Sequence, residues 1–120
     1  MKKDPGKNFS DLSMQELFQI EIETQSETLT SGLLSLEKNS AQPSVVESLM
    51  RAAHSLKGAS RLMGVRGIEQ IAHVLEDVFV AAQKNALVIG ADAVDICLRT
   101  VDVMKQIAAR GDAAGDDAEN

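Results

Sequence analysis

Apolar residues recur with the period of an α-helix in four separate segments of this chain, and this constrains its fold more than any other feature. In the first segment they fall within about 60° of one another on a helix that turns about 100° per residue. These residues are Phe18, Ile22, Leu29, Leu33 and Leu36. Ser13 and Glu16 have the spacing of a capping box. The first segment therefore predicts a helix that begins after Ser13 and runs to about Lys38.

The second segment follows Pro43 and starts with another candidate capping box, formed by Ser44 and Glu47. Gly64 is well placed to end this helix, because a glycine readily takes the positive φ that a helix C-terminus needs. The inner face is predicted to consist of Val46, Leu49, Ala53, Leu56, Ser60 and Met63.

A third helix is predicted to open near Gly67 and to end at about Asn85. Its buried face should contain Ile68, Ile71, Ala72, Leu75, Val78, Phe79 and Ala82. Residues 86–90 form an apolar connection, and a fourth helix is predicted over residues 91–109. Its main apolar stripe is Val94, Cys97, Leu98, Val101, Met104 and Ala108.

A second, narrower stripe lies on the opposite side of the fourth helix and consists of Ile96, Val103 and Ile107. A partner protein could bind this stripe, or the N-terminal segment around Phe9 and Leu12 could cover it. We expect packing within the chain, because a short bundle needs all the apolar contacts it can make.

The composition agrees with an all-helical domain, since aromatic residues make up only 2% of the chain and there are two prolines. Four amphipathic helices with short connections predict an all-α, antiparallel, up-down-up-down four-helix bundle. The bundle is expected over residues 13–109, after an N-terminal segment (1–12) and before an acidic linker (110–120). This organisation leaves room for a short extra helix at a terminus.

The charge distribution excludes several classes of function. The net charge is −6, and residues 111–120 carry four acidic side chains and no basic one. An acidic domain is a poor binder of nucleic acid, which requires a basic face. No apolar run approaches the ~20 residues of a membrane span, and no secretory signal opens the chain. The single Cys97, expected to be a small core residue, excludes an intrachain disulfide and fits the cytoplasm.

Candidate chemistry lies on the face of the second helix opposite its buried stripe. His54, Lys57 and Arg61 share this face, because residues three and seven apart are neighbours on a helix. Gly58 stands beside the histidine although a mid-helix glycine costs ~1 kcal/mol relative to alanine. Its advantage would be space for a large partner. Met50, one turn earlier, is either a filler at the edge of the core or a docking contact.

The third helix supplies a carboxylate that can complete this group. His73 and Glu76 are one turn apart, and Glu76 can point towards His54 if the second and third helices are adjacent. A carboxylate on one imidazole nitrogen fixes the tautomer and leaves the other nitrogen nucleophilic. Nearby cations would offset the charge of an incoming phosphoryl group. The sequence has no glycine-rich phosphate loop, so the domain could carry a phosphoryl group but not bind ATP.

These residues resemble the histidine-containing phosphotransfer (HPt) family. The segment RAAHSLKGAS, residues 51–60, is similar to its H-x-[LI]-K-G-x-[AS] motif, and residues 62–64 and 73–77 extend the likeness. Together they resemble the N-terminal phosphotransfer domain of CheA-type chemosensory histidine kinases over residues 13–108. The flanking residues are most similar to hybrid kinases of Wsp-type surface-sensing systems. Ser60 departs from the alanine or glycine of many members.

The resemblance implies a role for each matching residue. His54 would be the phosphoacceptor, and Glu76 would orient its imidazole. Lys57 would stabilise phosphate charge, and Gly58 would give clearance for docking. His73 would have a supporting role.

The resemblance also implies the partners. A separate ATP-binding kinase domain would phosphorylate the histidine, so that this domain is no enzyme on its own and its parent chain is a histidine kinase. A response-regulator receiver domain would then take the phosphoryl group on an aspartate. No cofactor is expected here, with ATP on the kinase and magnesium on the receiver.

Two other interpretations compete with phosphotransfer. His54, His73 and Glu76 are enough ligands for a metal, but Lys57 would repel a cation, so no metal is expected. The domain could instead be a non-catalytic interaction module that binds through the second stripe of the fourth helix. In that case replacing His54 would leave its function intact.

Overall fold

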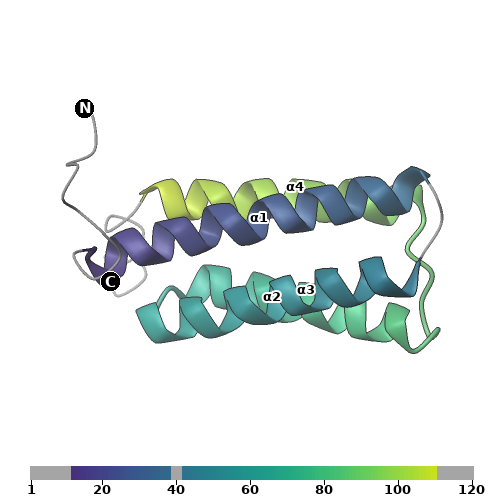
Figure 1. Ribbon diagram of the computed structural model, residues 1–120, viewed down its shortest axis with the longest axis horizontal. Helices are drawn as coiled ribbons and strands as arrows, with labels where there is room; N and C mark the ends of the chain where they lie inside the picture. The colour runs from purple at the N-terminus through teal and green to yellow at the C-terminus, as the bar shows by residue number, and fades with distance from the viewer. Residues whose placement is uncertain (1–11, 39–41, 111–120) are drawn as a thin grey trace.

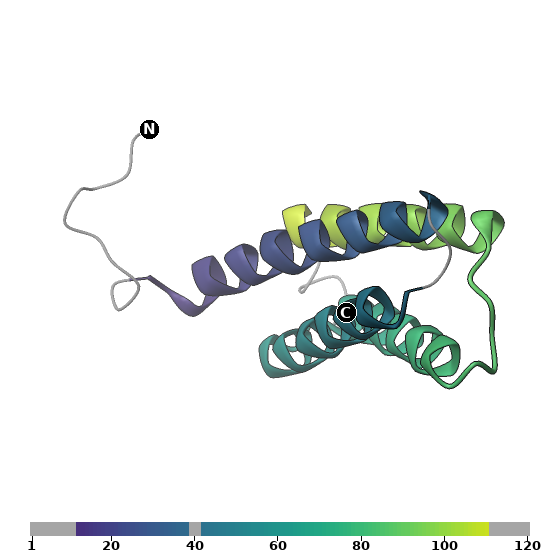
Figure 2. The same ribbon diagram turned by 45° about the vertical axis from the view of Figure 1, so that its right-hand side comes forward.

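The structure, a computed structural model, describes residues 12–38 and 42–110, which form four helices and no strand. The helices are α1 (Met14–Lys38), α2 (Pro43–Met63), α3 (Arg66–Gln83) and α4 (Ala91–Arg110). Consecutive helices run in opposite directions, and Figures 1 and 2 show α1 beside α4 on one side of the bundle and α2 beside α3 on the other. The predicted four-helix bundle is confirmed. The expectations for residues 1–11 and 111–120 lie outside the described residues.

The predicted apolar stripes form the core. Most of their members are buried, and the largest buried side chains include Phe79, Leu29, Leu33, Leu49 and Leu56. Ser26, Ala52 and Ile89 are buried as well, although the stripes did not include them. Five predicted core residues lie at the edges of the stripes and are only half-buried: Met63, Ile71, Val78, Ala82 and Leu98. Along the described part of the chain, no helix is long and apolar enough to cross a membrane.

One of the two predicted capping boxes is correct and the other is wrong. At α1, the backbone N–H of Glu16 donates to Ser13 Oγ (3.1 Å) and the N–H of Ser13 donates to Glu16 Oε1 (2.9 Å). At α2, the helix already begins at Pro43, and Gln42 is the N-cap without a side-chain hydrogen bond. Proline suits the first helical position because its φ is preset and it has no N–H to satisfy. Ser44 therefore lies inside the helix and cannot cap it.

The turn between α2 and α3 brings the two helices together side by side. Gly64 has φ 74°, as predicted, and its N–H donates to the carbonyl of Arg61. The helix α3 ends at Gln83, two residues before the expected end, and Asn85 follows it with φ 61°. Asparagine tolerates this left-handed conformation better than most residues, which explains its position after the helix.

The second stripe of α4 is only partly packed. Ile107 is half-buried, and its Cδ1 would lie 3.5 Å from a Cβ added at Gly67 of α3. Ile96 and Val103 are exposed, with 62% and 44% of their surface accessible. The expectation that the N-terminal segment covers this stripe includes Phe9, which lies outside the described residues.

Candidate functional site

The imidazole of His54 projects from the outer face of α2 into solvent. Its side chain is 67% exposed, whereas Ala53 beside it and Leu56 two residues on are fully buried. This contrast follows from the helical period, which places His54 well away from the buried stripe. The residue is therefore fixed on a rigid helix and open to a partner.

Glu76 of α3 connects His54 with Lys57. Its Oε2 lies 2.7 Å from His54 Nδ1, and its Oε1 lies 2.6 Å from Lys57 Nζ. The side chains of Glu76 and Lys57 are 14% and 20% exposed, so this ion pair is well shielded from solvent. Glu76 points towards His54 as the sequence predicted, but its pairing with Lys57 was not anticipated.

The surroundings of Glu76 keep it ionised. Burial raises the pKa of this carboxyl, but the hydrogen bonds and charges of Lys57 and His54 outweigh burial and leave the pKa below its ordinary value. An ionised carboxylate can only accept hydrogen bonds. His54 Nδ1 must therefore carry the proton and donate it to Oε2. In the neutral ring, the other nitrogen, Nε2, then has the lone pair.

The lowered pKa of Glu76 predicts a pH-dependent part of the stability. A carboxyl whose pKa is lower in the folded than in the unfolded state stabilises the fold above the unfolded value of about 4.5. This contribution is lost as the pH falls through the folded pKa. Chemical denaturation between pH 7 and 3 should therefore show a smaller loss of unfolding free energy in Glu76→Gln than in the wild type. Equal losses of unfolding free energy in the two proteins would contradict this prediction.

Gly58 leaves an opening beside His54. A Cβ built on it meets no atom within 4 Å, and the residue is exposed. Nothing inside the domain therefore requires glycine here. This opening is compatible with the predicted docking clearance, which stays a prediction.

Substitutions of Gly58 should affect the free energy of unfolding and the predicted rate of phosphoryl transfer differently. Gly58→Ala is expected to raise the free energy of unfolding by about 1 kcal/mol, because alanine favours the helix and meets no obstacle. If the domain transfers phosphoryl groups, as the resemblance implies, Gly58→Val should fold as well as the wild type but transfer them about tenfold or more slowly, because its branched side chain obstructs the partner. Denaturation curves and single-turnover transfer rates measure the two effects.

Gly32 is the matched control, since it is also a mid-helix glycine. Its added Cβ would lie 2.7 Å from Cδ2 of the buried Leu49. Overpacking of this kind costs about 1–3 kcal/mol, so Gly32→Ala should lower stability although it too removes a helical glycine. Unchanged transfer in Gly58→Val would refute the clearance argument.

The remaining predicted site residues, Arg61, His73 and Met50, make no ion pair or hydrogen bond with His54, Lys57 or Glu76 in the described part of the structure. Arg61 Nε is 2.8 Å from Glu69 Oε2, and His73 Nε2 is 3.6 Å from Asp77 Oδ2; both His73 and Arg61 are mostly exposed. Sequence reasoning missed Glu69 as a partner. Met50 is half-buried against the core, which favours the filler interpretation.

The competing metal site finds no support in the described residues. Among them, no three His, Cys, Asp or Glu side chains are grouped so that they could hold a metal ion. The proposed ligands are otherwise engaged, since Glu76 pairs with Lys57 and His73 lies near Asp77.

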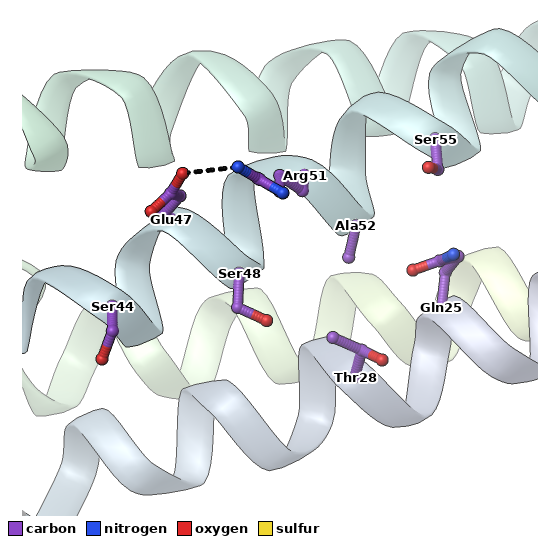
Figure 3. A pocket seen from close by; sticks show the side chains of 8 residues that line it. All are labelled: Gln25, Thr28, Ser44, Glu47, Ser48, Arg51, Ala52 and Ser55. Atoms are coloured by element: carbon purple, nitrogen blue, oxygen red, sulfur yellow. Dashed lines mark hydrogen bonds and ion pairs between the residues drawn. The ribbon is translucent and has the colours of Figure 1, made fainter.

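A separate hollow of about 410 Å³ lies between α1 and α2 (Figure 3). Hydroxyl side chains of Ser44, Ser48 and Thr28 line it, and its two charged residues, Glu47 and Arg51, pair with each other at 2.8 Å. It contains neither His54 nor Glu76. The site is thus the surface around His54 and not this hollow.

Comparison with known proteins decides the family. The sequence matches the Hpt domain family over residues 13–110, nearly the whole described region. The chain belongs to this family. An Hpt domain is a phosphoryl carrier and not a catalyst by itself.

Individual relatives of this Hpt domain include a sensor histidine kinase and a chemotaxis protein. It is 31% identical to the sensor histidine kinase CheAY of Helicobacter pylori over 107 residues and 33% identical to the chemotaxis protein CheA of Rhizobium meliloti over 109 residues. Each match covers 89% of this chain but only 13% and 14% of the relative.

A solved structure is similar to this Hpt domain as well. The CheA phosphotransferase domain from Thermotoga maritima superposes with a TM-score of 0.76 at 27% identity. The match covers 80% of this chain and 91% of that one. The likeness therefore extends over almost the entire solved domain.

Proposed function

We propose that His54 is the residue that carries the phosphoryl group, as a step between an ATP-dependent kinase domain and a receiver aspartate. The observation that supports this most is the 2.7 Å contact between His54 Nδ1 and the ionised Glu76, on an imidazole that is 67% exposed. This contact leaves Nε2 as the nucleophile that faces solvent.

The transfer step needs no proton to leave the site. The Nε2 lone pair attacks the γ-phosphorus of ATP, the new P–N bond forms, and the P–O bond to ADP breaks with its electron pair on ADP. The ring keeps its Nδ1 proton and becomes cationic, and the Glu76 carboxylate stabilises that charge. When an aspartate oxygen attacks the phosphorus, the P–N bond breaks and its electron pair returns to Nε2.

Lys57 has two roles in this proposal. Its ammonium holds Glu76 at 2.6 Å and so fixes the carboxylate that orients His54. Because Lys57 lies one helical turn from His54, its charge also attracts a phosphoryl group on that ring. Arg61 and His73 belong to the same surface, and we assign them supporting roles only.

The proposed partners would supply two requirements of the reaction, ATP binding and magnesium. ATP binding is assigned to a kinase domain and magnesium to the receiver, and this domain itself needs no cofactor. The matched region is 13–14% of the curated relatives, so we propose that the parent chain is also a histidine kinase. We place it in the cytoplasm, where ATP is available. The resemblance to Wsp-type hybrid kinases stays a prediction.

Incubation with ATP, magnesium and the catalytic domain of a CheA-type kinase tests the proposal. We expect one phosphoryl group per domain, stable to base and labile to acid, as a phosphoramidate is. Addition of a cognate receiver domain should then discharge it. No labelling of a folded domain by any CheA-type catalytic domain would overturn the proposal.

The alternative of a purely non-catalytic interaction module is not favoured. It relies on the second stripe of α4, of which Ile96 and Val103 are exposed. This alternative does not explain why Glu76 pairs with Lys57 out of solvent and also contacts His54.

A further inference from the structure

Two carboxylates of α3 lie on the same side of that helix and face α2. Glu69 and Glu76 are seven residues apart, which places them two turns apart on one face. Arg61 Nε donates a hydrogen bond to Glu69 at 2.8 Å, and the Lys57 ammonium lies 2.6 Å from Glu76. The two acidic side chains are only 27% and 14% exposed. Each carboxylate is thus largely withdrawn from solvent and paired with a cation of its own.

Lys57 lies between these two carboxylates along the interface of α2 and α3. The two helices run antiparallel on either side of Val65, so Lys57 is opposite His73. Glu69 is four residues before His73 and Glu76 is three residues after it, so each is about one helical turn from that level. The flexible lysine side chain spans one turn to contact Glu76. A reach of the same length in the other direction leads to Glu69.

Arg61 occupies the carboxylate that would compete for Lys57. It follows Lys57 by one turn on α2, and within the described part of the chain it is the only residue that forms an ion pair with Glu69. Arg66 is exposed and lies one turn before Glu69 on α3, but no ion pair joins the two in the described structure. Without Arg61, a half-buried carboxylate would therefore stand near the lysine with no cation.

We propose that Arg61 is a positioning residue of this site. By pairing with Glu69, it leaves Glu76 as the carboxylate that Lys57 holds. Lys57 in turn fixes the carboxylate that orients His54. This inference rests on the proposed function and assigns Arg61 a specific action in it, one that requires no contact with the phosphoryl group.

Loss of the Arg61 charge should move the lysine for a physical reason. Glu76 would keep the hydrogen bond from His54 Nδ1, whereas Glu69 would lose its ion-pair partner. A shielded carboxylate without a partner is more costly than one that retains a hydrogen bond. We therefore expect Lys57 to spend about two thirds of its time on Glu69. If only molecules with Lys57 on Glu76 react, the rate falls about threefold.

Arg61→Met tests this inference, because methionine keeps a long side chain but carries no charge. In protein labelled with ¹⁵N and ¹³C, NMR correlations across the hydrogen bond should connect Lys57 Nζ with the Glu76 carboxyl carbon in the wild type. In the variant they should connect it mainly with that of Glu69. Labelling of His54 from ATP by a CheA-type kinase domain should become about threefold slower. Arg61→Lys restores a cation and should recover both wild-type results.

The double variant Arg61→Met/Glu69→Gln separates positioning from a direct action of Arg61. A neutral amide attracts an ammonium much less than a carboxylate does, so Lys57 should return to Glu76. The wild-type rate should return with it, although the guanidinium is still missing. Glu69→Gln alone should also have the wild-type rate. If the double variant stays as slow as Arg61→Met, Arg61 acts directly on the phosphoryl group and the inference is wrong.

Arg51→Met is the matched control for the change in net charge. Arg51 is paired with Glu47 at 2.8 Å and lies three residues before His54, closer in the sequence than Arg61. The carboxylate that it releases is ten residues from Lys57, about 15 Å along the helix. Labelling should therefore keep the wild-type rate. Slowing equal to that of Arg61→Met would mean that net charge matters and the choice of carboxylate does not.

The NMR readout does not require phosphate on His54. If Lys57 moves to Glu69 in Arg61→Met but the wild type accepts no phosphoryl group, the proposed function is contradicted and the choice of carboxylate is supported. If His54 is labelled but Lys57 stays on Glu76 in the variant, for instance because Arg66 takes over Glu69, the inference alone is wrong. Movement of Lys57 with no loss of labelling rate would also overturn it.

Discussion

His54→Gln is expected to fold like the wild type and to accept no phosphoryl group at all. The side chain is 67% exposed and faces away from the core, so its replacement should alter the free energy of unfolding by at most about 0.5 kcal/mol. Glutamine has no ring nitrogen with a free lone pair, and the nucleophile is lost completely. Circular dichroism checks the fold, and labelling from ATP by a kinase domain checks the acceptor.

His73→Gln is the matched control for this substitution. His73 is also an exposed helical histidine near a carboxylate, with 58% of its side chain accessible and Asp77 at 3.6 Å. Its variant should still be labelled to the level of the wild type. Residual acid-labile phosphate on His54→Gln, or loss of labelling in His73→Gln, would mean that the acceptor is misassigned.

The core of the fold was predictable because the helical spacing of apolar residues is enough to indicate which face of each helix is buried. Most members of the stripes that contain Phe18, Leu49, Phe79 and Val101 are buried as expected, and the exceptions lie at the edges of the stripes. The start of α2 was not predictable from its Ser-x-x-Glu pattern, because Pro43 competes for the same position. A proline that can open a helix moves the cap one residue upstream of itself, and the serine then loses that role.

The contact between His54 and Glu76 was predictable for a reason visible in the sequence. Once Gly64 is recognised as the turn, α2 and α3 form an antiparallel pair about Val65. Residues equally distant from Val65 then face each other, as His54 and Glu76 do at a separation of 22 residues. Arg61 and Glu69, separated by eight, obey the same symmetry, and this signal could have identified Glu69.

The pairing of Lys57 with Glu76 could not be read from that symmetry. Lys57 lies opposite His73 in the register about Val65, and its long flexible chain reaches one turn away to find the shielded carboxylate. Which of several acids a lysine selects depends on burial and local charge, and both exist only in the folded domain. The contact of His73 could not be predicted from the sequence for the same reason: its ring lies near Asp77. Its supporting role stays a prediction.

Glu76→Gln is expected to slow phosphorylation of His54 about 100-fold, and more than Glu76→Ala, for which we expect about tenfold. The reason is Lys57. Its ammonium can only donate hydrogen bonds, so it draws the amide oxygen of the introduced glutamine to itself and leaves the amide NH₂ facing His54 Nδ1. An NH₂ group there favours the tautomer with the proton on Nε2, which cannot attack phosphorus.

Two measurements distinguish this explanation from a general loss of structure. The ¹⁵N chemical shifts of the His54 ring should show protonated Nδ1 in the wild type and protonated Nε2 in Glu76→Gln. The double variant Lys57→Met/Glu76→Gln should recover part of the rate, because without the ammonium the amide can turn its oxygen towards Nδ1. Asp77→Asn is the control and should keep the wild-type rate, because Asp77 is next to Glu76 in the sequence but its side chain is 72% exposed and lies near His73. If Glu76→Gln and Glu76→Ala are equally slow and share one tautomer, Glu76 does not act by directing the proton.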